Sequence, residues 1–242
     1  MSNLNKTKIK AILFDSGRVL NQSSTGHWFI TPNFFKYVDR HKFDSIKKSR
    51  QKEAFSKAYE YIDKQKFILT ESDEYTHFLE FYKIFSDNLP ELGLIKDDIK
   101  SITNDYVYNY EKYTFFEDVP STLQKLSQSY KLAIVSDAWP SLEGIFINMN
   151  LRKYFSSFII SSQKGITKPN ELMFRLALQE LNVQPEESIF IDYNPKNCEA
   201  AMKFGITPII LCRDLKSYIF TKIKYRNILV VRNLNDIYDI LN

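Results

Sequence analysis

The sequence predicts an α/β protein: a doubly wound parallel sheet, the three-layer core of Rossmann-like folds, with a small α-helical cap domain inserted after the first strand. Short apolar runs occur near the start of the chain and again in its second half, where helical patterns separate them. Strands that are apolar throughout are buried on both faces, which is typical of parallel sheets covered by helices. Residues 21–111 interrupt this alternation with helical patterns alone.

The strand-forming runs end at polar or turn residues. The first, Ile9–Phe14, stops at Asp15 and Gly17, which indicates a buried strand followed by a turn. Among the helices between the later runs, we expect one to begin at Pro169 and another to end at Gly205. The later runs are Leu132–Val135, Phe158–Ile160, Ile189–Ile191, Pro208–Leu211 and the weaker Ile228–Val231.

The insert contains three amphipathic helical patterns and no convincing strand. Each pattern places aromatic and aliphatic residues on one helix face, and we expect these stripes to pack a helical core rather than contact a ligand. The stripes are Phe55, Ala58, Tyr59 and Ile62; Tyr75, Phe78, Leu79, Tyr82 and Phe85; and Ile99, Ile102 and Tyr106. The predicted domains are therefore a core of residues 1–20 and 112–242 and a helical cap of residues 21–111.

Composition and charge exclude several classes of protein. The 242 residues carry a formal net charge of +4 with both signs interspersed, which indicates no nucleic-acid surface. Cys198 and Cys212 are too few for a disulfide framework, so we expect buried apolar thiols and a reducing compartment. The polar start lacks the apolar region of a secretory signal and no stretch is long enough to span a bilayer. We therefore expect a cytoplasmic protein with no membrane partner.

Polar residues follow the predicted strands, at the sheet edge where open parallel sheets bind their ligands. They are Asp15, Ser136, Lys168 with Pro169, and Asp192. Together they suit phosphoryl transfer. Asp15 would attack phosphorus, Ser136 would donate a hydrogen bond to a phosphate oxygen, and Lys168 would balance the negative charge. Mg²⁺ would bridge the carboxylates and the phosphate.

Four segments follow one another in the order and spacing of a known family. They are Ile12-Leu-Phe-Asp15-Ser-Gly-Arg-Val-Leu20, Ile134-Val-Ser136-Asp137, Gly165-Ile-Thr-Lys168-Pro169 with Phe174, and Phe190-Ile-Asp192-Tyr-Asn-Pro-Lys-Asn197 running to Gly205-Ile206. This pattern, which covers most of residues 8–212, resembles the haloacid dehalogenase-like hydrolase superfamily. The helical insert after the first motif resembles the cap of the family's first subclass. The run Phe-Asp-x-Gly-x-Val-Leu resembles the branch of sugar-phosphate phosphatases.

The resemblance implies a role for each motif residue. Asp15 would be the nucleophile, Ser136 a phosphate ligand and Lys168 the charge-balancing residue. A magnesium site would use Asp15, the carbonyl oxygen of Gly17 and Asp192.

Two positions depart from the family pattern. Most phosphatases of the family carry a second Asp two residues after the nucleophile, as general acid and base, where this chain has Gly17. Such catalysis typically contributes a factor of about 10² to 10⁴. The fourth motif usually supplies a metal ligand at the position of Tyr193, and a neutral phenol is a poor magnesium ligand. Metal affinity would then be reduced, or Asp192 would replace the missing ligand.

Three further residues are candidates for substrate binding. Asp137 would replace the missing acid and base, or else cap a helix before Pro140. Arg18 would add positive charge to the site, or else lie solvated on the surface. His27 follows the first motif closely enough to affect specificity, although a histidine in the insert is more often structural.

The function predicted from these residues is magnesium-dependent hydrolysis of a small phosphate ester through an aspartyl-phosphate, with a small phosphorylated metabolite as partner. One alternative is a catalytically weakened relative that binds a phosphate ligand or interacts with another protein. A 2-haloacid dehalogenase ranks lower, because the position of its water-activating Asp is Asn197, which is not a base at neutral pH.

Overall fold

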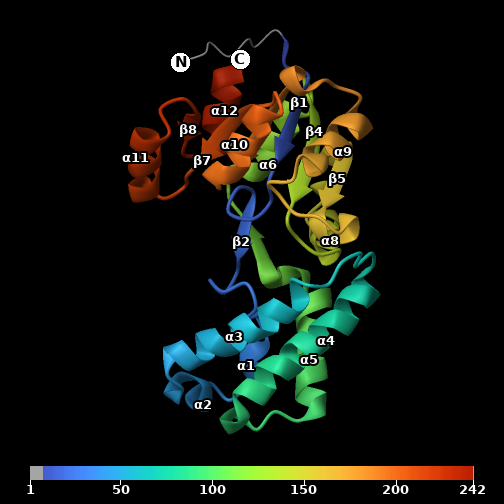
Figure 1. The fold of residues 1–242 in the computed structure, drawn as a ribbon, viewed down its shortest axis with the longest axis vertical. Coiled ribbons are helices and arrows are strands. Elements are labelled where there is room, and N and C mark those ends of the chain that lie inside the picture. Colours follow the sequence, from blue (N-terminus) through green and yellow to red (C-terminus); the bar gives the residue numbers. More distant parts are fainter. Residues whose placement is uncertain (1–7, 242) are drawn as a thin grey trace. The chain divides into compact units, whose positions relative to one another are not determined.

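In the computed structural model, which describes residues 8–241, the apolar runs form one six-stranded sheet in the order β5-β4-β1-β6-β7-β8 (Figure 1). Each described pairing in it is parallel. The predicted doubly wound core is confirmed. Its strands are β1 (Ala11–Phe14), β4 (Lys131–Ser136), β5 (Ser157–Ile160), β6 (Ser188–Asp192), β7 (Thr207–Leu211) and β8 (Leu229–Val231).

The register of the central strands places the motif residues together. Phe14, the last residue of β1, pairs with Ile134 of β4 and with Ile191 of β6. The residues that follow β1, β4 and β6 therefore emerge at one edge of the sheet. This is the edge predicted to carry the chemistry.

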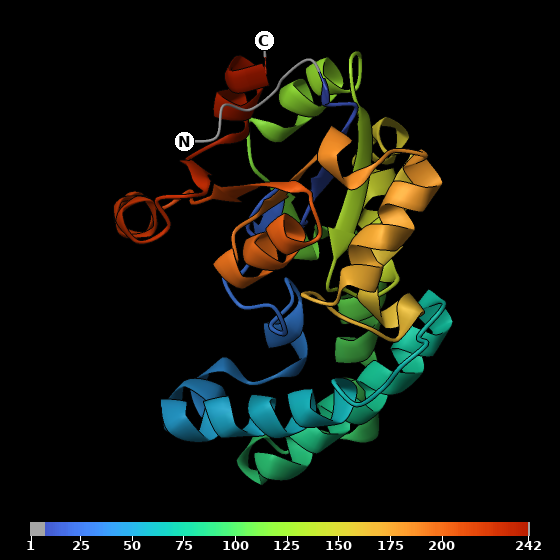
Figure 2. The same cartoon turned by 45° about the horizontal axis from the view of Figure 1, so that its top comes forward.

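Alternate strand residues face two helical layers. Leu13 and Val135 are fully buried in a cluster with Phe174 of α9, whereas Phe14 lies edge-on to Phe155, at a centroid distance of 6.2 Å. Figure 2 gives a second view of these layers. The helices of this part are α6 (Val119–Leu126), α8 (Ser161–Lys164), α9 (Glu171–Leu181), α10 (Pro195–Lys203), α11 (Leu215–Lys224) and α12 (Leu234–Leu241), with short 3-10 helices at Arg152–Tyr154 and Pro185–Glu187. Helix α7 (Ser141–Asn148) belongs to this part only from Phe146 onward.

One predicted helix start is wrong. Helix α9 begins at Glu171 rather than at Pro169, because the side chain of Asn170 accepts a hydrogen bond from the Leu172 amide and caps the helix there. The predicted end at Gly205 agrees with the structure, since this residue follows α10 with a φ of +93°.

The insert folds as a helical unit around an aromatic core. Its stripes supply buried residues such as Phe55, Phe78, Phe85 and Tyr106, whereas Tyr59 is exposed. A capping box of Thr70 and Asp73 starts the longest helix. The helices are α1 (Phe34–Tyr37), α2 (Arg40–Ser45), α3 (Lys48–Ile62), α4 (Glu71–Asn88) and α5 (Lys96–Tyr108), with 3-10 helices at Pro90–Leu92 and Tyr110–Lys112.

Two short strands lie where the insert begins and ends. β2 (Asn21–Ser23) and β3 (Tyr113–Phe115) form a two-stranded sheet. The expectation of no strand within residues 21–111 is therefore wrong at residues 21–23. The chain divides into two compact units, of which the helical one contains Ser23–Thr114 and also Trp139–Ile145. The division into residues 21–111 and the remainder stays a prediction.

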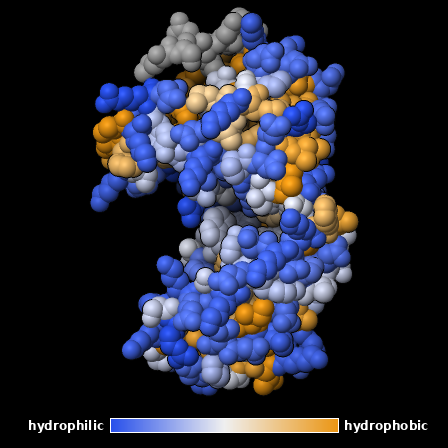
Figure 3. All heavy atoms as spheres, in the orientation of Figure 1, coloured by the Kyte–Doolittle hydropathy of each residue, from blue (hydrophilic) through white to orange (hydrophobic). Residues whose placement is uncertain are grey.

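Helix α11 carries an exposed apolar side. Leu215, Ile219, Phe220 and Ile223 are each exposed by half or more, whereas Thr221 is buried (Figure 3). Within residues 8–241, no helix combines the length and the apolar character that crossing a membrane requires.

Candidate active site

Asp15 is a buried carboxylate at the end of β1. One of its oxygens, Oδ1, accepts hydrogen bonds from Lys168 Nζ at 2.7 Å and from Ser136 Oγ at 3.1 Å. Among the described residues, none donates to the other oxygen, Oδ2. Burial raises the pKa of Asp15 from 3.8 to about 7, although the Lys168 charge opposes the rise. The structure thus brings together three residues predicted from separate motifs.

Lys168 lies between two carboxylates. Its Nζ contacts Asp15 Oδ1 and also Asp192 Oδ2, the latter at 3.0 Å, and its side chain is almost fully buried. Burial by itself lowers the pKa of this lysine, but the charges of Asp15, Asp192 and Asp137 outweigh burial and hold the pKa above its ordinary value. Lys168 is therefore a fixed cation at this sheet edge.

Asp192 is fully buried and both of its oxygens are engaged. Oδ1 accepts from the Asn194 amide at 2.7 Å, and Oδ2 accepts from Asn197 Nδ2 at 2.8 Å in addition to Lys168. Asn197 thus orders the loop after β6. Asn194 is a residue that the sequence analysis missed, although its position before Pro195, the first residue of α10, is a recognisable helix-capping signal.

Asp137 does not cap a helix. Its Oδ1 accepts a hydrogen bond from the backbone amide of Lys168 at 2.9 Å, so the capping alternative is wrong. The side chain is exposed and fixes the main chain that carries Lys168. Its predicted part in substrate binding stays a prediction.

Gly17 and Tyr193, the two departures from the family motifs, lie at the same edge. Gly17 forms a β-bridge with Asn21, and its φ is not positive. The ring of Tyr193 lies under the guanidinium of Arg18, at 4.9 Å from its centroid. Burial raises the pKa of the Tyr193 phenol, which stays protonated at neutral pH.

A family comparison connects this geometry to known proteins. The family described as "Haloacid dehalogenase-like hydrolase" matches residues 19–211. The chain belongs to this family. The hydrolase is 25% identical over 137 residues to a phosphoserine phosphatase of Thermus thermophilus, covering 55% of each chain. It is 28% identical over 130 residues to a glyceraldehyde 3-phosphate phosphatase of Pyrococcus furiosus, covering 48% of this chain and 54% of that protein. It thus spans about half the length of these curated relatives.

Solved structures share the fold over nearly the whole hydrolase. A HAD phosphatase from Thermococcus onnurineus has a TM-score of 0.64 at 20% identity, covering 97% of this chain and 98% of that one. The L-2-haloacid dehalogenase of Xanthobacter autotrophicus has a TM-score of 0.62 at 17% identity, covering 96% and 98%. A HAD family enzyme from Bacteroides thetaiotaomicron, solved with magnesium and inorganic phosphate, has a TM-score of 0.56 at 18% identity, covering 84% and 93%.

The side chains of this hydrolase do not fit a resident magnesium ion. Within residues 8–241, no three His, Cys, Asp or Glu residues gather as metal ligands. The oxygens of Asp192 already accept hydrogen bonds from three N–H donors, which disfavours the alternative that Asp192 replaces the ligand missing at Tyr193. Asp15 and the Gly17 carbonyl would remain, fewer than the six oxygen ligands that magnesium requires unless water supplies most of them. The predicted metal site stays a prediction.

His27 belongs to the helical unit. Its Nδ1 accepts a hydrogen bond from the Phe29 amide, and its ring lies 4.6 Å from the ring of Phe55. Burial lowers its pKa, so the imidazole is neutral at pH 7. These contacts make it part of the aromatic packing, and its predicted effect on specificity stays a prediction.

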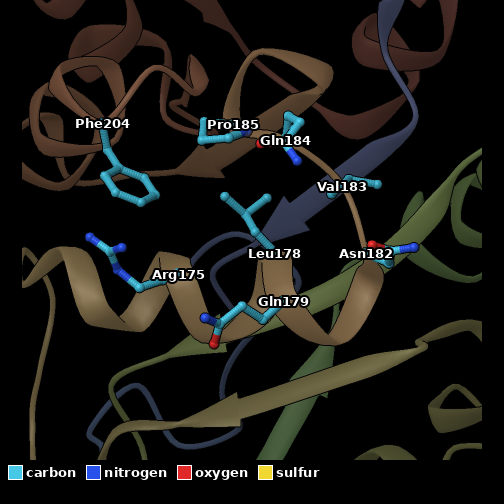
Figure 4. A pocket seen from close by; sticks show the side chains of 8 residues that line it. All are labelled: Arg175, Leu178, Gln179, Asn182, Val183, Gln184, Pro185 and Phe204. Atoms are coloured by element: carbon cyan, nitrogen blue, oxygen red, sulfur yellow. The ribbon is translucent and has the colours of Figure 1, made fainter.

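A separate cavity of about 400 Å³ lies between α9, the following loop and the end of α10 (Figure 4). It adjoins Pro185, just before β6, and therefore the opposite sheet edge from Asp192. Arg175, its one charged side chain, pairs with Glu171 and lies over the ring of Phe204. The cavity offers no nucleophile, and the chemistry is concentrated around Asp15.

Proposed function

We propose that this hydrolase cleaves small phosphate monoesters, with Asp15 as the nucleophile. The observation that carries this is the asymmetry of the Asp15 carboxylate: Oδ1 is held by Lys168 and Ser136, and Oδ2 has no donor among the described residues. A carboxylate fixed through one oxygen presents the other for attack. The named activities of the two phosphatase relatives support a small phosphorylated metabolite as substrate.

In the first step, Oδ2 of Asp15 attacks phosphorus and the bond from phosphorus to the ester oxygen breaks. The bonding electrons leave with that oxygen, which takes a proton from water to form the alcohol. Two of the three N–H donors of Lys168 contact Asp15 and Asp192, and the third would donate to a phosphate oxygen as charge builds on it. Because Gly17 has no side chain to donate the proton, we expect good leaving groups to react fastest.

In the second step, water attacks the aspartyl-phosphate. The bond from phosphorus to Asp15 breaks, which releases inorganic phosphate and restores the carboxylate, while the proton from water passes to solvent or phosphate. Asp137 is the nearest further carboxylate in sequence to Ser136 and is the candidate for accepting that proton. Lys168 remains charged throughout, because its pKa is held above its ordinary value.

A phosphate-ligand binder without turnover is the second candidate. The two departures favour it, since Gly17 removes the acid and base and Tyr193 removes a metal ligand. Dehalogenation has less support. Asn197 donates its amide hydrogen to Asp192 and therefore cannot activate water.

The test is turnover of p-nitrophenyl phosphate by the wild type and by Asp15→Asn, each in EDTA and in magnesium. We expect Asp15→Asn to lose at least about 10³-fold in kcat, because an amide is not a nucleophile. Asp87→Asn, at an exposed position in α4, is the matched control and should keep full turnover. Full turnover by Asp15→Asn would show that Asp15 is not the nucleophile. If the wild type binds phosphate without turnover, the protein is the phosphate-ligand binder of the second candidate function. Chloride release from 2-chloropropionate would identify a dehalogenase.

A further inference from the structure

Arg18 and Tyr193 form a cation–aromatic pair beside Asp15. Arg18 follows Asp15 by three residues, and Tyr193 comes directly after β6. Strands β1 and β6 are neighbours in the sheet. The guanidinium carbon lies 4.9 Å from the centre of the Tyr193 ring. The ring face attracts the cation and aligns the planar guanidinium, which places a second positive charge at this edge.

The backbone of Arg18 is held in an uncommon conformation. Its φ is +63°, in the left-handed region that residues other than glycine rarely adopt. The turn fixes it there, because the Arg18 amide donates to the carbonyl of Asn21 at 2.6 Å. Such strain is concentrated at functional sites, where the surrounding structure maintains it.

The guanidinium of Arg18 is free to bind an anion. Among the described residues, no carboxylate pairs with it, and the side chain is exposed. Arg213, by contrast, pairs with Asp118 at 3.0 Å, and Arg175 pairs with Glu171 at 2.8 Å. Arginine presents five N–H donors in a planar fork that matches phosphate oxygens.

The charges around Asp15 require a further cation if a dianion is to bind. Asp15, Asp137 and Asp192 face the single ammonium of Lys168. The solved relative described above holds magnesium with its phosphate, but the side chains here do not fit that ion. Arg18 supplies a further cation, stacked on Tyr193 directly after β6, and the Tyr193 ring stands where the family's metal ligand is missing.

We propose, building on the function proposed above, that Arg18 stacked on Tyr193 is an anion-binding group that replaces the divalent cation, so that the site binds a phosphate dianion without metal. Lys168 and Ser136 then orient the Asp15 carboxylate, and Arg18 neutralises the ligand's charge. The ligand class is a phosphate monoester or inorganic phosphate.

Calorimetric titration with inorganic phosphate tests this, in EDTA at about pH 8, where a phosphate group is a dianion. We expect the wild type to bind phosphate, and Arg18→Asn to bind it at least about tenfold more weakly, as for the loss of one charge-assisted hydrogen bond. Asn tolerates positive φ, so this variant removes the charge without adding strain. Arg18→Lys keeps the charge and should bind with intermediate affinity.

Arg175→Asn is the matched control, because Arg175 is an exposed arginine of the same unit at the opposite sheet edge. Its phosphate affinity should equal that of the wild type. Phosphate binding by the wild type only when magnesium is added would overturn the proposal, as would equal affinities of wild type and Arg18→Asn in EDTA. Either result leaves the phosphatase reaction intact, since turnover and its loss in Asp15→Asn are measured separately. Absence of phosphate binding in both conditions also refutes the anion site.

Tyr193→Asp gives an opposite readout. The new carboxylate would pair with Arg18 and supply an oxygen ligand, so we expect phosphate binding in EDTA to fall and to return with magnesium. Electron paramagnetic resonance should detect bound Mn²⁺ in this variant and none in the wild type. Mn²⁺ bound by the wild type in the presence of phosphate would again contradict the metal-free site.

Discussion

Two buried lysines, Lys112 in the helical unit and Lys168 at the sheet edge, each lie beside a carboxylate and a serine, but the chain satisfies them differently. Lys112 donates to the Tyr106 carbonyl at 2.6 Å and to Ser141 Oγ at 2.8 Å. Glu74, 3.9 Å from Lys112, accepts from both the amide and the hydroxyl of Ser141 at 2.7 Å. Both partners are fully engaged, as in a structural network.

The Lys168 cluster has more negative charge than its lysine neutralises, and within residues 8–241 one of its carboxylate oxygens has no donor. Burial lowers the pKa of Lys112 but is outweighed at Lys168, where three carboxylates surround one ammonium. Asp15 correspondingly has a raised pKa, and its Oδ2 is the oxygen that no described residue donates to. The two clusters show that burial and ion pairing alone do not distinguish a reactive site from a structural one. What distinguishes the Lys168 cluster is that its carboxylates are incompletely paired.

The largest expected effect is on the structural network. Lys112→Met leaves Glu74 buried without its cation, so we expect the free energy of unfolding in urea to fall by about 3–5 kcal/mol. Lys57→Met, which breaks an exposed pair with Glu53, should cost less than about 1 kcal/mol. Equal stability of the two variants would show that Lys112 does not stabilise the buried Glu74 carboxylate.

Lys168→Met should instead affect turnover. Removing the cation from Asp15 and Asp192 should lower kcat for p-nitrophenyl phosphate by about 10² to 10³-fold, as for the loss of one donor that stabilises developing charge. Lys10→Met, at an exposed position of the same unit, is the control and should retain wild-type kcat. If Lys168→Met kept its turnover but lost as much stability as Lys112→Met, both clusters would be structural.

The sequence predicts one of these clusters and not the other, for a physical reason. Asp15 follows one apolar strand and Ser136 and Asp192 end two others, so sheet topology alone brings them to one edge. Nothing in the linear pattern connects Ser141 with Glu74, which is 67 residues away in sequence. Ser141 follows Pro140 at the start of an apolar helix, which favours the core, yet residues 139–145 belong to the helical unit.

Other contacts that the sequence did not predict also join residues that are distant in the chain. Asp137 was interpretable as a local cap, whereas its partner, the Lys168 amide, lies 31 residues away. The stacking of Arg18 on Tyr193 also joins distant positions. Local patterns determine the strands and the ends of several helices, but contacts between side chains that are distant in sequence require the fold.

Asp15→Asn should stabilise the protein more at high pH. The pKa of Asp15 is about 7 in the folded chain and near 3.8 when unfolded, so ionisation lowers folded-state stability as pH rises between these values. The variant removes this loss. At about 1.4 kcal/mol per pKa unit, its gain in unfolding free energy should be about 1–3 kcal/mol larger at about pH 8 than at about pH 5. An equal gain at both pH values would show that burial does not raise the pKa of Asp15.

The smallest effect is expected at Gly17, where relatives of the family place the general acid. Gly17→Asp should speed hydrolysis of alkyl phosphates relative to aryl phosphates by about tenfold, because an alkoxide needs a proton in the transition state and a phenoxide does not. Gly17 has no positive φ, so its backbone conformation does not itself disfavour Asp. Gly17→Asn, which has the same shape and no acidic proton, is the control and should leave the ratio unchanged. If Gly17→Asp folds and also leaves it unchanged, another group already supplies the proton, and Asp137, beside the Lys168 amide, is the residue to substitute next.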